Sequence, residues 1–85
     1  MIKFKTVALG QEGQDVVVLQ AMLRALQYLG KDGKPIDIDG RCGNNTVFAI
    51  NTFQRVQIAY GFDCGKNGKP DGKFGPKCWE RLLGV

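Results

Sequence analysis

The sequence predicts an all-α fold, a compact three-helix bundle that forms a single domain over residues 1–85. Two observations predict it. Apolar residues recur at helical spacing in three segments, and each segment follows a glycine-rich stretch with the spacing GxxG. Two of these stretches, DGRCG and DGKFG, begin at Asp39 and Asp71, 32 residues apart, and apolar residues align after them. We therefore also expect an internal duplication with DGxxG loops.

The first helix is expected from about Asp15 to Tyr28. Asp15 would lie in its first turn, where the helix dipole favours an anion, and Gly30 is placed to end the helix. Steps of three and four residues give this segment one apolar stripe, formed by Val16, Leu19, Leu23 and Leu26.

The second helix is expected from about Asn44 to Gln57, with Gly43 or Asn44 capping its start. The third is expected from about Pro76 to Leu83, because proline suits the first helical position. Eight residues are too few for an isolated helix in water, so this one must dock through its apolar face. The apolar faces of these two helices are Val47, Ile50 and Phe53, and Trp79, Leu82 and Leu83.

A nearly repeated hexapeptide predicts a minor hairpin or a tight loop at each of its two copies. GKDGKP covers residues 30–35 and GKNGKP covers residues 65–70. Asp-Gly and Asn-Gly are preferred at the centre of a type I′ turn, where both central residues need positive φ. The lysines of the two copies are candidates for contact with an anionic polymer.

Composition argues against most catalytic and metal sites. The chain has no histidine, which removes the commonest general base and the usual catalytic triads. Three cysteines without histidine do not make a structural zinc site. A calcium loop with Gly40 at its sixth position would need glutamate at its twelfth, where the chain has Thr46. We expect no catalytic residue, no metal and no cofactor.

The three cysteines are Cys42, Cys64 and Cys78. Two interpretations remain open: reduced, part-buried thiols that act as small apolar residues, or one disulfide and one free thiol.

The net charge of +4 favours anionic partners only weakly. A helix-turn-helix on nucleic acid is disfavoured, because the loop over residues 30–43 is long and the second helix carries one basic residue, Arg55. No apolar run is long enough to span a membrane or to form a signal peptide. We expect neither nucleic acid nor membrane as partner.

The start of the second helix is the candidate binding site. Free N–H groups at a helix start attract anions, and Arg41 precedes them in sequence. Asn44 and Asn45 add amide donors and acceptors that suit a peptide or an N-acetyl sugar. Tyr28 and Tyr60 would offer aromatic faces with a polar tip.

The order of these motifs resembles the peptidoglycan-binding module found on bacterial and phage wall hydrolases. The resemblance covers residues 9–84. It is carried by GxxGxDVxxLQ (Gly10, Gly13, Asp15, Val16, Leu19, Gln20), by DGxxGxxTxxAIxxFQ (Asp39, Gly40, Gly43, Thr46, Ala49, Ile50, Phe53, Gln54) and by DGxxG (Asp71, Gly72, Gly75). We add the motif residues Asp39 and Gln54 to the expected ligand-binding set.

The resemblance implies a non-catalytic, monomeric module that recognises peptidoglycan through its stem peptide, its glycan or both. It implies action at the cell wall, in an extracellular or periplasmic location, where the module targets an attached or partner lytic enzyme such as an endolysin or autolysin. Anionic wall polymers are further candidate partners. The alternative is a protein–protein interaction module that keeps the fold and has lost wall binding, because fold alone does not determine function.

Overall fold

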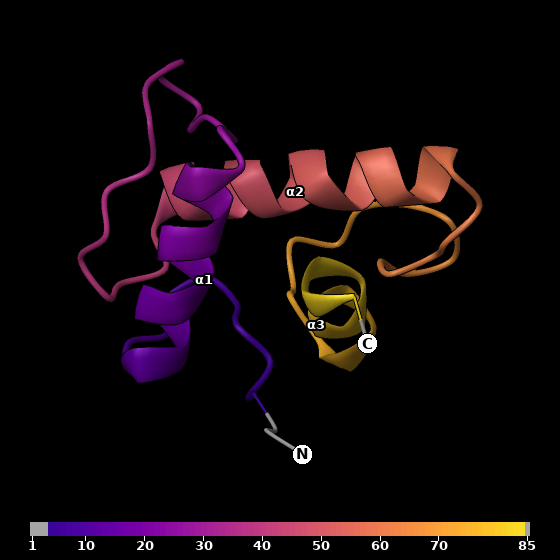
Figure 1. The fold of residues 1–85 in the computed structure, drawn as a ribbon, viewed down its shortest axis with the longest axis horizontal. Helices are drawn as coiled ribbons and strands as arrows, with labels where there is room; N and C mark the ends of the chain where they lie inside the picture. The colour runs from indigo at the N-terminus through magenta and orange to yellow at the C-terminus, as the bar shows by residue number, and fades with distance from the viewer. Residues whose placement is uncertain (1–3, 85) are drawn as a thin grey trace.

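The chain is described by a computed structural model that covers residues 4–84 and contains three helices: α1 (Gln14–Ala25), α2 (Asn44–Ala59) and α3 (Pro76–Leu83). Within these residues it has no strand, only isolated β-bridges. In Figure 1, α2 lies across the top, α1 meets its N-terminal half, and α3 is seen nearly end on beneath its C-terminal half. The expectation of an all-α, three-helix fold is confirmed.

Loops as well as helices build the core. Phe74, which precedes α3, is fully buried among aromatic rings, with centroids 5.3 Å from Phe53 and 5.0 Å from Trp79. The N-terminal segment closes this core, because Val7 exchanges two backbone hydrogen bonds with Phe74, at 3.0 and 2.8 Å. The indole N–H of Trp79 donates to the carbonyl of Lys5 at 3.1 Å. The short helix α3 therefore packs against the aromatic core and against the N-terminal segment, because a helix of this length is not stable alone.

Helix α1 is shorter than expected: it ends at Ala25 rather than near Tyr28. Gln27 adopts the left-handed conformation (φ 65°), and the N–H of Tyr28 bonds to the carbonyl of Leu23 at 2.9 Å. This is a Schellman ending with glutamine where glycine is usual. As a consequence Leu26 leaves the apolar stripe and is 54% exposed.

Gly30 therefore does not end α1. It is buried beside α2, and a Cβ added to it would lie 2.8 Å from the Cβ of Asn45. The glycine at this position allows the first loop to approach α2 closely.

Helix α2 begins at Asn44 as expected, after Gly43 at the N-cap position, and continues two residues past the expected end to Ala59. It also ends in a Schellman arrangement: Gly61 has φ 92°, and the N–H of Phe62 bonds to the carbonyl of Gln57 at 2.9 Å. Helix α3 has the expected bounds, with Pro76 at its first position.

The two hexapeptides form different turns. In the second copy Asn67 and Gly68 both have positive φ, and the residues flanking them, Lys66 and Lys69, exchange two backbone hydrogen bonds at 2.8 and 3.0 Å. This is the expected two-residue hairpin turn.

The first copy forms a tight loop between Leu29 and Pro35, which make an antiparallel bridge, but its turn is not of type I′. There Gly33 has positive φ (76°) and Asp32 does not. The turn is closed one residue earlier, because the N–H of Gly33 donates a hydrogen bond to the carbonyl of Gly30 at 3.0 Å. The N–H of Gly30 in turn donates to the carbonyl of Lys34 at 2.9 Å. The Asp32 carboxylate accepts the N–H of Lys34 at 3.0 Å, which stabilises this wider loop.

Candidate functional site

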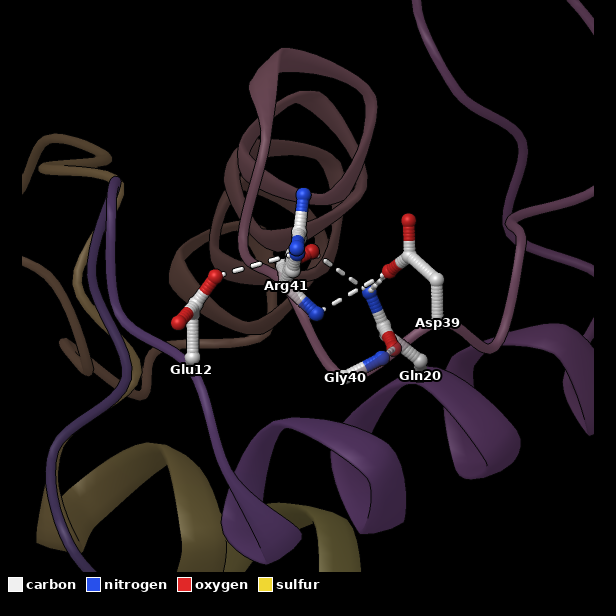
Figure 2. Close-up of polar contacts among 5 residues, drawn as sticks. All are labelled: Glu12, Gln20, Asp39, Gly40 and Arg41. Carbon is white, nitrogen blue, oxygen red and sulfur yellow. Dashed lines mark hydrogen bonds and ion pairs between the residues drawn. The ribbon is translucent and has the colours of Figure 1, made fainter.

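A buried glutamine on α1 holds the first DGxxG turn in place. Figure 2 shows the side-chain amide of Gln20 reaching into this turn. Its oxygen accepts the N–H of Gly40 at 2.9 Å, and its nitrogen donates to the Arg41 carbonyl at 2.8 Å and to the Asp39 carboxylate at 3.0 Å. The nitrogen also lies 3.1 Å from the Thr46 hydroxyl on α2. One side chain thus links α1, the turn and the start of α2.

The carboxylate of Asp39 is part of this arrangement rather than a free group. Its Oδ1 accepts the backbone N–H of Arg41 at 3.0 Å as well as the Gln20 amide. These two hydrogen bonds, the one from the Arg41 N–H first, lower the pKa of Asp39 from its ordinary value. Asp39 is therefore an anion at neutral pH, and its outer oxygen faces away from these donors (Figure 2).

The same set of hydrogen bonds occurs at the second DGxxG turn. The buried Gln54 of α2 accepts the N–H of Gly72 at 3.1 Å and donates to the Lys73 carbonyl and the Asp71 carboxylate, both at 2.8 Å. The nitrogen also approaches the sulfur of Cys78 at 3.4 Å. Gln54 thus does for the second turn what Gln20 does for the first.

A polar hollow lies where the first turn meets the start of α2. Its volume is about 480 Å³. Its lining consists of Lys31, Asp32, Asp37, Asp39, Arg41, Gly43, Asn44, Asn45 and Thr46. The first loop forms one wall, because Asn45 accepts the N–H of Lys31 at 3.1 Å and its amide lies 3.5 Å from the Asp32 carboxylate. The hollow thus offers cationic, anionic and amide groups to one ligand.

Of the two cationic side chains of this hollow, Arg41 already has a partner. Nε of Arg41 lies 3.0 Å from Oε1 of Glu12 (Figure 2), and the two side chains are 76% and 65% exposed. An ion pair this exposed contributes about 0.2–1 kcal/mol. A ligand carboxylate can therefore displace Glu12 at small cost.

Four of the seven residues expected to bind ligand come together in this hollow: Asp39, Arg41, Asn44 and Asn45. The other three do not line it. Gln54 is buried and bonded to the second turn. Tyr28 is half-buried with its ring edge-on to Phe53, at a centroid distance of 5.8 Å, and Tyr60 is 75% exposed.

Burial also raises the pKa of Tyr28, with the neighbouring Tyr60 as a smaller cause. In the sequence each tyrosine follows a helix end, Tyr28 after α1 and Tyr60 after α2.

Sequence reasoning missed Asp32 and Asp37 as lining residues, and it named Lys31 only as a candidate contact for an anionic polymer, without placing it beside Arg41. They precede the turn in a loop whose return onto α2 depends on the fit of Gly30 against Asn45, a contact that no local pattern shows. The sequence did contain a signal for the role of Gln20 in holding the turn: a polar residue directly follows Leu19 of the apolar stripe.

Residues 4–84 contain no group of three or more His, Cys, Asp or Glu side chains that could hold a metal ion. No helix among these residues has the length and apolar character needed to cross a membrane.

A family model described as "Putative peptidoglycan binding domain" matches residues 12–57 of the chain. The match covers more than half of the chain. It includes α1, the first DGxxG turn and most of α2, with the start of α2 that borders the hollow. The second turn and α3 lie outside it, so it is shorter than the resemblance over residues 9–84. No curated protein and no solved structure matches the chain.

Proposed function

The chain belongs to the peptidoglycan-binding domain family, and from this premise we propose that it is a non-catalytic wall-binding module whose hollow at the start of α2 receives peptidoglycan. The ligand would be the stem peptide, the glycan or both. The observation that carries the proposal is the meeting of Asp39, Arg41, Asn44 and Asn45 around one polar hollow inside the family match.

The chemistry of the hollow suits the polar groups of the wall polymer. A stem-peptide carboxylate would take the place of Glu12 on Arg41, whose guanidinium can bind a carboxylate through two N–H groups. The amides of Asn44 and Asn45 can pair with peptide bonds or N-acetyl groups, which carry the same donors and acceptors. Asp39, an anion held by Gln20, would accept a hydrogen bond from an ammonium or hydroxyl group of the ligand.

The remaining expected residues take secondary parts in this proposal. Tyr60, largely exposed, and Tyr28, half-buried, would contact sugar rings outside the hollow. Gln54 would act indirectly, by holding the second DGxxG turn. The loop lysines would add salt-sensitive contacts with anionic wall polymers. Those lysines are Lys31, Lys34, Lys66 and Lys69.

We further propose that the module acts as a monomer at the cell wall, outside the membrane, and targets an attached or partner lytic enzyme to its substrate. Tethering raises the effective concentration of an enzyme at a polymer without any new catalytic group. Binding to one soluble fragment should be weak, micromolar or weaker, because the surface is small and the ligand polar.

The two DGxxG units would descend from an internal duplication. The equivalent hydrogen bonds of Gln20 and Gln54 support this, since each amide contacts the aspartate, the glycine N–H and the following carbonyl of its own turn.

The proposal is tested by co-sedimentation with purified sacculi stripped of other wall polymers, at low and at moderate salt. The variant is Arg41→Ala and its matched control is Arg55→Ala, which removes the same charge from an exposed position on α2 outside the hollow. We expect the parent chain and the control to pellet with the sacculi and Arg41→Ala to pellet several-fold less.

Equal loss in both variants would mean that net charge, not the hollow, drives binding. A parent chain that stays in the supernatant with stripped and with unstripped walls would refute wall binding and favour the protein–protein interaction module.

A further inference from the structure

The three cysteines are all buried and free, but they are not equivalent in position. Cys42 lies in the first DGxxG turn. Cys64 follows α2, and Cys78 lies in the first turn of α3. The thiol of Cys78 donates a hydrogen bond to the backbone carbonyl of Cys64 at 3.0 Å.

The Cys78 thiol therefore lies directly against the backbone of Cys64. Burial raises the pKa of the Cys64 thiol to about 12, and a hydrogen bond with the Cys78 side chain is the second cause. No such neighbour acts on Cys42, where burial alone raises the pKa to about 11. Because the sulfur of Cys64 is only a few bonds from the carbonyl that Cys78 contacts, rotation of the two side chains can bring the sulfurs within bonding distance.

We propose that Cys64 and Cys78 are a disulfide-forming pair, which closes a ring over residues 64–78 when the chain meets a disulfide oxidant, and that Cys42 remains a free thiol. The sequence left open the interpretation of one disulfide and one free thiol, and the proposal assigns the disulfide to Cys64 and Cys78. It does not rest on wall binding.

The reaction balances with a small disulfide such as oxidised glutathione. The Cys64 thiol, 6% exposed and more accessible than the fully buried Cys78, loses its proton and attacks one glutathione sulfur, releasing one glutathione thiol. The Cys78 thiolate then attacks the Cys64 sulfur of the mixed disulfide and releases the second glutathione. The two protein thiols are oxidised and the oxidant is reduced to two thiols.

The ring would stabilise the second unit. It encloses the hairpin at Asn67-Gly68 and the second DGxxG turn, and it ties this loop covalently to α3. The raised pKa of the Cys64 thiol and the burial of both sulfurs make exchange slow in the folded protein, because the thiolate is the attacking species. The bond should therefore form most readily during folding.

The test uses the full chain, reduced and then incubated with oxidised and reduced glutathione, in one arm folded and in the other during refolding from urea. Free thiols are blocked with N-ethylmaleimide in denaturant, and the chain is cut with trypsin. Cleavage after Lys and Arg separates the three cysteines, into residues 42–55, 56–66 and 78–81. We expect a mass two hydrogens lower, a link between 56–66 and 78–81, and the blocking group on Cys42.

Three blocked cysteines in both arms, or links that involve Cys42 as often as Cys78, would overturn the proposal. Cys42→Ala should keep the link. Cys78→Ala should leave both remaining cysteines blocked, which controls for indiscriminate pairing. The linked form should melt about 10 °C or more above the reduced form, since a ring of this size restricts the unfolded chain. An unchanged melting temperature would refute the stabilising role.

Discussion

Replacement of Gln20 by leucine tests the central structural element of the candidate site. The side chain is fully buried, and leucine fills a similar volume without any hydrogen-bonding group. The change leaves the buried N–H of Gly40 and the carbonyl of Arg41 without their partners at 2.9 and 2.8 Å. The exposed Asp39 carboxylate can turn to water instead.

Two unpaired backbone groups cost about 1–3 kcal/mol each, so the loss is about 2–6 kcal/mol. Burial of the more apolar leucine side chain offsets about 1–2 kcal/mol of this. The net loss lies between about 0 and 5 kcal/mol, and from the mid-values we expect the free energy of unfolding to fall by about 2–3 kcal/mol. A domain of this size has a total stability of about 4–13 kcal/mol.

The assay is urea denaturation followed by the fluorescence of Trp79, the single tryptophan of the chain, which lies in the core. Gln14→Leu is the matched control, because Gln14 is exposed on the same helix, and its effect should stay within about 0.5 kcal/mol. NMR titration gives a second readout: the pKa of Asp39 should rise once the Gln20 amide is lost.

A Gln20→Leu variant as stable as the control, with an unchanged Asp39 titration, would refute the reasoning that this glutamine holds the turn.

Three further outcomes are expected. Gln27→Gly should raise the free energy of unfolding by about 1 kcal/mol, because glycine adopts the left-handed conformation at the end of α1 without strain; a thermal melt no higher than the parent's would contradict this. Burial raises the pKa of Cys42 from 9.0 to about 11, so the unfolded chain loses this proton first and stability should fall as the pH rises from about 9 to 11. In Cys42→Ala the free energy of unfolding, measured by denaturation across this pH range, should decrease less with pH than in the parent chain. An equal decrease in both proteins would contradict this. Glu12→Gln should strengthen binding of soluble muropeptide up to about fivefold, since it frees Arg41 from an ion pair worth about 0.2–1 kcal/mol; a weaker complex in an isotherm would argue that Glu12 itself contacts the ligand.

The alternation of glycine turns and apolar periodicity was sufficient to determine three helices and where two of them begin. Gly43 and Gly75 precede helices that start at Asn44 and Pro76 as expected; both glycines have extended backbone at the N-cap position, and proline suits the first helical position of α3. The DGxxG turns were also readable. Gly40 and Gly72 have φ of 77° and 72°, which favours glycine whatever the neighbours.

Only tertiary packing decided where α1 ends. Local pattern favoured a helix to Tyr28, but the Tyr28 ring packs against Phe53 of α2, and Gln27 takes a left-handed conformation at the turn toward it. The two hexapeptides differ for a similar reason. In the first copy Asp32 approaches the Asn45 amide on α2, a contact outside the repeat itself.

The candidate site likewise divides in two. Arg41, Asn44 and Asn45 could be expected from sequence, because they surround one helix start. Three features could not: the return of the loop with Lys31, Asp32 and Asp37 onto this helix start, the ion pair between Arg41 and Glu12, and the contact of the Cys78 thiol with the Cys64 carbonyl. Sequence determines backbone preference and apolar periodicity over a few residues, whereas these contacts join residues 14 to 29 positions apart or depend on how a loop returns to a helix, which the packing of the whole core decides.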